Sequence, residues 1–262
     1  MTKPAIAHSL VLRAVVAAAG VFLVAGVGLA EEGAGLQEAG THVTNIASLQ
    51  SGARTFFNYC SGCHSLKYMR YSRIAQDLQL TDDDVLKNFA AAGAKIGDLA
   101  VSNMPSQPAS GDVPAQGAEV WFGKAPPDLS LEIRAKGADW VYTYLKSFYV
   151  DPTRPVGWNN TVFPNASMPF PLWELQGVQT PVYAPAKPGS EAAVEKLELS
   201  TPGKLTPAQY DDTVRDLTAF LEYASEPASL QRHSIGVWVL LYLAFFTLLA
   251  YLLKHEYWKD VH

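Results

Sequence analysis

Cysteine is almost absent from this chain of 262 residues, which contains only Cys60 and Cys63. Because there is no second pair of cysteines, a four-cysteine zinc site is excluded, and so is any disulfide other than one between these two residues. Positive charge is also in short supply, with 20 Lys and Arg against 25 Asp and Glu and a formal net charge of -5. An acidic protein of this kind is not typical of nucleic-acid binding, so we expect no nucleic-acid partner.

The two cysteines lie in the stretch NYCSGCHSLKYMRY, where His64 directly follows Cys63. The pattern Cys-x-x-Cys-His is the attachment signature of a c-type haem, in which both thiols add to porphyrin vinyl groups and the histidine is an axial iron ligand. Thioredoxin-like redox pairs and structural disulfides share the cysteine spacing. A thioredoxin-like pair should follow a strand, whereas the preceding residues, SLQSGARTFFNY, are typical of a short helix. The sequence therefore predicts one covalently bound haem c on Cys60 and Cys63, with His64 as ligand.

The first 30 residues have the composition of a bacterial secretory signal peptide. Lys3 and Arg13 precede an uncharged run from Ala14 to Ala30, and two glutamates follow it. We predict that residues 1–30 are removed near Ala30, with an uncleaved N-terminal anchor as the alternative. Removal would take away two positive charges and make the mature protein more acidic still.

A second apolar run, IGVWVLLYLAFFTLLAYLL, extends from Ile235 to Leu253. Its 19 residues would span roughly 28 Å as a helix, which is close to the thickness of the bilayer core. Trp238 and Trp258 lie near its two ends, where aromatic side chains favour the membrane interface. We predict a transmembrane anchor at residues 233–254 in the bacterial inner membrane, with residues 31–232 in the periplasm and 255–262 in the cytoplasm.

Residues 31–232 are enough for one domain with its own core, and we expect an all-α fold with long loops. Helices are predicted at 81–93, at 138–149 and over LTPAQYDDTVRDLTAFLEYASEP, where Thr206 as N-cap and Gln209 form a capping box. Segments 104–130 and 150–190 are rich in Pro and Gly and are expected to be loops. A small hairpin could join GVQTPVY to VEKLELS.

The second axial ligand of the iron is to be sought among the methionines. Met69 is too close to His64 in sequence to reach the opposite face of the porphyrin, which leaves Met104 and Met168 outside the signal peptide. A thioether ligand favours a dry pocket, and Met168 lies in FPNASMPFPLW, whereas Met104 leads into the more polar SNMPSQPASG. The residues alone favour Met168 without excluding Met104.

Four blocks in this order resemble the cytochrome c1 family over about residues 45 to 259: CSGCHSLKYMRYSRI, APPDLSLEIRAKGADWVYTYL, VFPNASMPFPLW and the final segment DLTAFLEYASEPASLQRHSIGVWVLLYLAFFTLLAYLLKHEYW. The resemblance implies a cytochrome c-like haem domain in which Met168 is the sixth ligand. It implies that the carbonyl group of Pro127 accepts a hydrogen bond from the ring N–H of His64. It also implies that Arg134 pairs with a haem propionate.

The function that the resemblance implies is electron transfer within the membrane-bound ubiquinol:cytochrome c oxidoreductase, with no bond chemistry by this subunit alone. The implied partners are cytochrome b, a Rieske [2Fe-2S] protein as donor and a c-type cytochrome as acceptor. The alternatives are a haem subunit of a terminal oxidase or another respiratory shuttle, and a haem enzyme or sensor with an open iron site. Acidic clusters at 82–84, 191–198 and 211–212 could steer a basic acceptor, although two of them lie in the first turns of predicted helices, where negative charge is favourable anyway.

Overall fold

The computed structural model describes residues 35–107, 116–185 and 193–260. The chain divides into two units, residues 1–36 and 37–262, and the fold described below is that of the second. The predicted signal peptide, residues 1–30, and its alternative as an uncleaved anchor lie outside the described residues.

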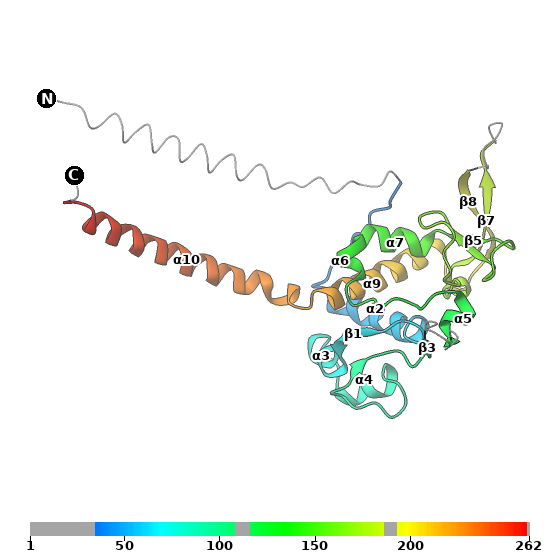
Figure 1. Ribbon diagram of the computed structural model, residues 1–262, viewed down its shortest axis with the longest axis horizontal. Coiled ribbons are helices and arrows are strands. Elements are labelled where there is room, and N and C mark those ends of the chain that lie inside the picture. The colour runs from blue at the N-terminus through cyan, green and yellow to red at the C-terminus, as the bar shows by residue number, and fades with distance from the viewer. Residues whose placement is uncertain (1–34, 108–115, 186–192, 261–262) are drawn as a thin grey trace. The chain divides into compact units, whose positions relative to one another are not determined.

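Helices are interspersed with short strands along the described part of the chain (Figure 1). The helices are α2 (Ile46–Tyr59), α3 (Tyr71–Asp77), α4 (Asp82–Asn88), α5 (Ala118–Phe122), α6 (Glu132–Lys136), α7 (Ala138–Lys146), α8 (Trp173–Gln176), α9 (Pro207–Ser225) and α10 (Ser229–Tyr257). The strands are β1 (Leu66–Arg70), β2 (Leu99–Ala100), β3 (Ser106–Gln107), β4 (Gln116–Gly117), β5 (Phe148–Val150), β6 (Trp158–Asn160), β7 (Gly177–Tyr183) and β8 (Val194–Pro202).

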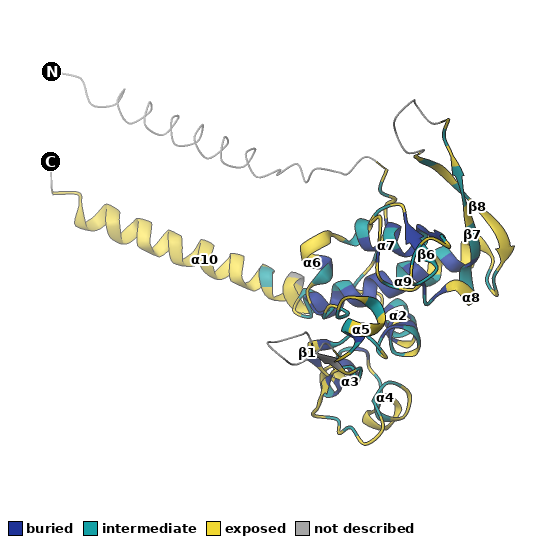
Figure 2. Cartoon of the chain, turned by 45° about the vertical axis from the view of Figure 1, so that its right-hand side comes forward, coloured by how far each residue is buried: buried dark blue, intermediate teal, exposed yellow. Residues whose placement is uncertain are grey.

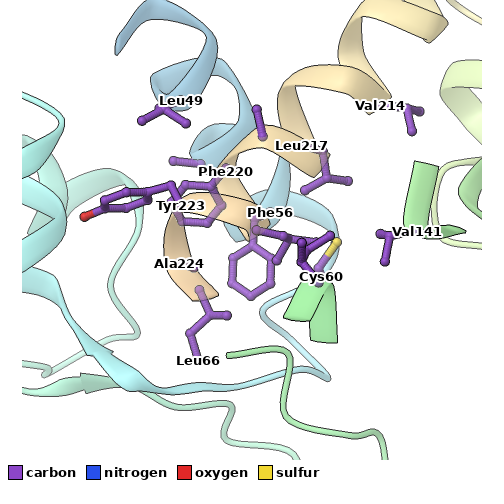
Figure 3. Packing of buried hydrophobic residues seen from close by; sticks show 14 of the residues in the cluster. Leu49, Phe56, Cys60, Leu66, Val141, Val214, Leu217, Phe220, Tyr223 and Ala224 are labelled. Carbon is purple, nitrogen blue, oxygen red and sulfur yellow. The ribbon is translucent and has the colours of Figure 1, made fainter. Parts of the chain in front are cut away.

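The core of the domain forms where α2 crosses α9. Gly52 permits the close approach, because a Cβ atom at this position would lie 2.0 Å from the backbone oxygen of Asp216. Next to the crossing, the buried rings of Phe56 and Phe220 pack with centroids 5.7 Å apart. Figure 3 shows the side chain of Cys60 among the residues of this packed cluster, so the cysteine motif begins inside the core at the end of α2.

The predicted start of α9 is confirmed. The Thr206 side chain accepts a hydrogen bond from the backbone of Gln209, the Gln209 side chain bonds back to the backbone of Thr206, and Pro207 is the first helical residue. The α9 helix is then tied to α7, because the buried Tyr210 hydroxyl donates to the carbonyl oxygen of Leu145 at 2.9 Å. The long helix that completes the core is thus fixed at both its cap and its first turns.

The expectation of an all-α fold is only approximately right. Four two-stranded antiparallel sheets pair β1 with β2, β3 with β4, β5 with β6 and β7 with β8 among the described residues. The expected hairpin is present as β7 and β8. The segments expected to be loops, 104–130 and 150–190, also carry short helices and strands. Such short strands depend on pairing between segments distant in sequence, which local composition does not reveal.

The helix predicted at 138–149 ends earlier, at Lys146, as α7. Phe148 belongs to β5, where it pairs with Asn160 of β6. The side chain of Ser147 bonds the carbonyl oxygen of Thr143 at the end of the helix, and the strand pairing then replaces the helical hydrogen bonds. The helix predicted at 81–93 forms as α4 with Thr81 as its N-cap, but it ends earlier, at Asn88.

The apolar run near the C-terminus lies in α10. Residues Ser234–Tyr257 form the one helix, within the described ranges, that is long and apolar enough to cross a membrane. Figure 2 colours the residues of this helix as exposed almost throughout. A core helix of a soluble domain would be largely buried, so the exposure of these side chains favours a membrane-spanning role.

Candidate haem site

The Cys-x-x-Cys-His motif forms a tight turn at the end of α2. The backbone N–H of His64 donates to the carbonyl oxygen of Cys60 at 2.8 Å, and that of Cys63 donates to the same oxygen at 3.0 Å. Both thiols are free, Cys60 buried and Cys63 half-buried. The turn therefore presents two reduced cysteines and a histidine from one short segment that is anchored in the core.

Burial makes the Cys60 thiol a poor thiolate. Its pKa is raised to about 12, mainly by burial and secondarily by the neighbouring Cys63. Burial also raises the pKa of Cys63. A metal or a redox reaction would need the thiolate, whereas a thioether is uncharged and suits an apolar position. An uncharged thioether therefore suits the buried position of Cys60.

His64 is held by the loop that carries Pro127. Its ring Nδ1 lies 2.8 Å from the Pro127 carbonyl oxygen. A carbonyl oxygen only accepts hydrogen bonds, so Nδ1 carries the proton and the lone pair of Nε2 is left for a metal ion. Burial lowers the pKa of His64, opposed by the hydrogen bond to Pro127 and by nearby carboxylates, so the neutral ring is favoured at pH 7.

The Pro127 loop is itself fixed by Asp128 and Ser130, two residues that our sequence analysis did not single out. Asp128 accepts hydrogen bonds from the backbone of Lys67 at 2.9 Å and of Ser130 at 3.0 Å. The Ser130 hydroxyl accepts from the backbone of Tyr68 at 3.2 Å. The sequence signal was the Asp-x-Ser pattern after the prolines, which is typical of a turn closed by its own side chains.

Met168 lies in a segment that is fixed from both sides. Upstream, the buried Asn160 side chain accepts hydrogen bonds from the backbone of Val162 at 2.9 Å and of Phe163 at 3.0 Å. Downstream, Phe170 is buried and stacks on Phe148 with ring centroids 4.8 Å apart. Met168 itself is half-buried and packs against the hydrophobic core. These asparagine contacts could not be predicted, because an asparagine in a Pro-rich segment is usually a solvated loop residue.

Met104 lies in a different setting, close to the cysteine turn itself. Its backbone N–H donates to the Ser102 hydroxyl at 3.1 Å, and that hydroxyl donates to the carbonyl oxygen of Gly62 at 2.7 Å. The backbone of Ser102 also donates to the Ser65 hydroxyl at 2.9 Å. Met104 is therefore tied to the segment that carries His64, whereas Met168 is contacted by Tyr144 of α7.

Arg134 lies on α6 with its side chain exposed. It has no ion-pair partner among the residues that the structure describes, and so its guanidinium is available to an external anion. The structure does not bring Arg134 into contact with His64 or Met168.

Apolar side chains beside the motif and in the segment of Met168 fit the presence of a large apolar group. Val101 and Leu131 are each 47% exposed and Phe163 is 46% exposed. Val101 precedes Ser102 and Leu131 follows Ser130, so both adjoin the hydrogen bonds that fix the motif. A porphyrin is a flat apolar group that could cover such side chains, and the residues present therefore fit a haem in their donor set and in their apolar surroundings.

The sequence as a whole matches a known family model, that of the Cytochrome C1 family, over residues 37–261. The chain belongs to this family.

Its relatives include cytochromes c1 and a protein with a different name. The chain is 49% identical to a cytochrome c1 of Allochromatium vinosum over 228 residues, which are 87% of this chain and 90% of that protein. It is 40% identical over 215 residues to a protein of Nitrosomonas europaea named ammonia monooxygenase gamma subunit, covering 82% of this chain and 84% of that protein. A mitochondrial cytochrome c1 haem protein of Schizosaccharomyces pombe is 28% identical over 236 residues, 82% of this chain and 67% of that one.

Proposed function

We propose that this chain is the haem-bearing electron-transfer subunit of a bacterial ubiquinol:cytochrome c oxidoreductase. The observation that carries the proposal is the contact between His64 Nδ1 and the Pro127 carbonyl oxygen, 2.8 Å apart, beside two free cysteines in a member of the cytochrome c1 family. In this role Cys60 and Cys63 would hold one haem c as thioethers, and His64 and Met168 would be the ligands of its iron.

The residues of the chain set the conditions for electron transfer and perform no bond chemistry of their own. A haem ligated by histidine and methionine carries one electron at a comparatively high reduction potential. Pro127 keeps His64 in the tautomer that offers Nε2 to the iron. The Asn160 contacts and Phe170 position Met168, and Arg134 offers its guanidinium to a propionate.

We place the domain, residues 31–232, in the periplasm, with residues 233–254 as the anchor in the inner membrane and residues 255–262 in the cytoplasm. The partners are cytochrome b, the Rieske [2Fe-2S] protein as electron donor and a c-type cytochrome as acceptor. The support for this assembly is family membership and the exposed apolar α10. The name of the Nitrosomonas relative and the alternative of a terminal-oxidase subunit point to other complexes. Identification of the subunits that co-purify with this chain distinguishes these two complexes from the proposed ubiquinol:cytochrome c oxidoreductase.

The acidic clusters offer limited support for steering a basic acceptor. Asp82, Asp83 and Asp84 are in the first turn of α4, where they favour the helix itself. Asp211 is paired with Lys146 at 2.7 Å, and Asp212 is paired with a neighbouring arginine. Glu191 lies outside the described residues. These carboxylates are therefore largely engaged within the chain itself, and the charge of the acceptor has to be established by experiment.

The ligand assignment is tested by comparing Met168→Leu with Met104→Leu in the full-length protein. Met168→Leu should abolish the sulfur-to-iron charge-transfer band of the oxidised protein. It should lower the reduction potential by a substantial part of the roughly 0.8 V that axial ligands control. Both variants should keep a haem stain on a denaturing gel, because the thioether bonds are unaffected.

Met104→Leu should leave the band and the potential almost unchanged, which makes it the matched control. A band lost in Met104→Leu and kept in Met168→Leu would contradict the assignment of the ligand. Loss of the haem stain from the denatured wild-type protein would contradict covalent attachment, and with it the whole proposal.

A further inference from the structure

The hydroxyl group of Tyr144 contacts the sulfur of Met168. It donates a hydrogen bond to Sδ with an oxygen-to-sulfur distance of 3.5 Å. A thioether sulfur is a weak acceptor, and hydroxyl-to-sulfur bonds are longer than hydroxyl-to-oxygen bonds. The contact is notable because it reaches the very atom that the proposed function assigns to the iron.

The ring of Tyr144 has little freedom to move away from this contact. It is stacked on Trp140 with centroids 5.0 Å apart and planes 9° apart, and it meets Phe148 edge-on at 4.9 Å. The ring of the half-buried Tyr144 is therefore held by an aromatic neighbour on each of two sides, which fixes the position of its hydroxyl group. Aromatic contacts of this kind stabilise the ring beyond the area they bury.

The backbone at Tyr144 is also tied to the segment that carries Met168. The Asn160 side-chain N–H donates to the Tyr144 carbonyl oxygen at 2.8 Å, while Asn160 Oδ1 holds the backbone of Val162 and Phe163. In addition, Phe148 stacks on Phe170, two residues beyond the methionine. The hydroxyl and the sulfur are thus brought together by several independent contacts.

We infer that Tyr144 raises the reduction potential of the iron by donating a hydrogen bond to the Met168 sulfur, an inference that rests on the proposed ligand role of Met168. A thioether sulfur has two lone pairs, so one can bind the iron while the other accepts from the hydroxyl. The hydrogen bond withdraws electron density from the sulfur and weakens its donation to the metal. Weaker donation favours the reduced, less positive iron, and hydrogen bonding next to an axial ligand is one of the means by which proteins tune haem potentials. Tyr144 is therefore a tuning residue that acts through Met168.

The test compares Tyr144→Phe with wild type in the full-length holoprotein in membranes, by redox titration and by the sulfur-to-iron band. The matched control is Tyr142→Phe on the same helix. Tyr142 is buried, and its hydroxyl is bonded to Lys146 at 3.2 Å. At a fixed ambient potential, Tyr144→Phe should decrease the ratio of reduced to oxidised haem about two- to tenfold. The upper limit is set by the net free energy of one hydrogen bond, which changes an equilibrium constant by at most about tenfold. Its charge-transfer band should persist, and Tyr142→Phe should match wild type.

Two results would overturn the inference. An unchanged ratio in Tyr144→Phe would mean that the hydroxyl does not act on the sulfur. Loss of the charge-transfer band in this variant would mean that the hydroxyl holds the ligand in place and does not tune an existing bond. If the wild-type protein itself lacks the band, the proposed ligand Met168 is wrong, which is a different failure.

A second variant keeps the test valid if Tyr144→Phe does not accumulate. Site-specific replacement of Tyr144 by 3-fluorotyrosine retains the ring and makes the hydroxyl a stronger donor. The ratio of reduced to oxidised haem should then rise above that of wild type. A ratio equal to or below that of wild type would contradict the inference.

Discussion

Replacing Gly52 with alanine should force α2 and α9 apart. The added Cβ atom would lie 2.0 Å from the carbonyl oxygen of Asp216 and 2.7 Å from the Cβ atom of Phe220. The nearest of these atoms belongs to the backbone of a helix, so no side-chain rotation can relieve the overlap. Because α2 ends at the cysteine turn, the same displacement moves Cys60 relative to the core.

The size of the effect follows from that overlap. The helices must separate by roughly 1 Å or more before the new methyl group reaches van der Waals contact. Overpacking of a tight core typically costs about 1–3 kcal/mol, and the gain of about 1 kcal/mol in helix propensity from glycine to alanine offsets only part of a large clash. We expect a net loss of about 2 kcal/mol, which corresponds to a decrease in Tm of about 4–8 °C for a domain of this size.

The assay is thermal unfolding of the holoprotein, followed by circular dichroism and by haem absorbance. The control is Gly97→Ala, because a Cβ atom at Gly97 meets nothing within 4 Å and the residue has no left-handed backbone conformation. The control should shift Tm by less than about 2 °C. A Gly52→Ala protein as stable as the control would show that the two helices do not cross as closely as described, and the argument for how the cysteine turn is positioned would fail with it.

Two further predictions concern the Met168 segment and the anchor. Asn160→Ala removes the buried acceptor of two backbone N–H groups, so it should lower the free energy of unfolding by about 2–3 kcal/mol and weaken the sulfur-to-iron band. The control Asn103→Ala, at an exposed position, should change neither quantity. An intact band in Asn160→Ala would contradict the role of Asn160 in positioning Met168. Truncation after Glu226, just beyond the end of α9, should yield a soluble haem domain that no longer assembles stably with cytochrome b, and full membrane retention of this form would instead indicate that residues 1–30 are an uncleaved anchor.

Features with local causes could be predicted from the sequence. The capping box at Thr206 and the N-cap at Thr81 depend on residues three positions apart, and both are found as expected. The apolar run of α10 is a matter of composition alone. The contact of His64 with Pro127 joins residues 63 positions apart, and its expectation came from resemblance to the family and not from spacing.

Features that depend on distant contacts could not be predicted. The role of Asn160 arises because its side chain reaches α7 and the following loop at once, and nothing in the neighbouring sequence indicates either partner. Phe148 fits the helical period of Trp140 and Tyr144, yet pairing with β6 places it in a strand. Its ring still meets the ring of Tyr144, although its backbone is in a strand and not in the helix.

The two proposed iron ligands are positioned by separate parts of the chain, and this separation makes the proposals independently testable. His64 depends on the crossing of α2 with α9 and on the Pro127 loop, whereas Met168 depends on Asn160 and on the aromatic contacts of α7. Gly52→Ala should therefore lower global stability while the sulfur-to-iron band of the folded protein persists. Asn160→Ala should weaken that band even at temperatures where the protein is fully folded, because local order around a residue can be lost before the whole domain unfolds. If both variants changed stability and band in the same proportion, the segments that position His64 and Met168 would form one cooperative unit. The conclusion that separate contacts position these two residues would then be wrong.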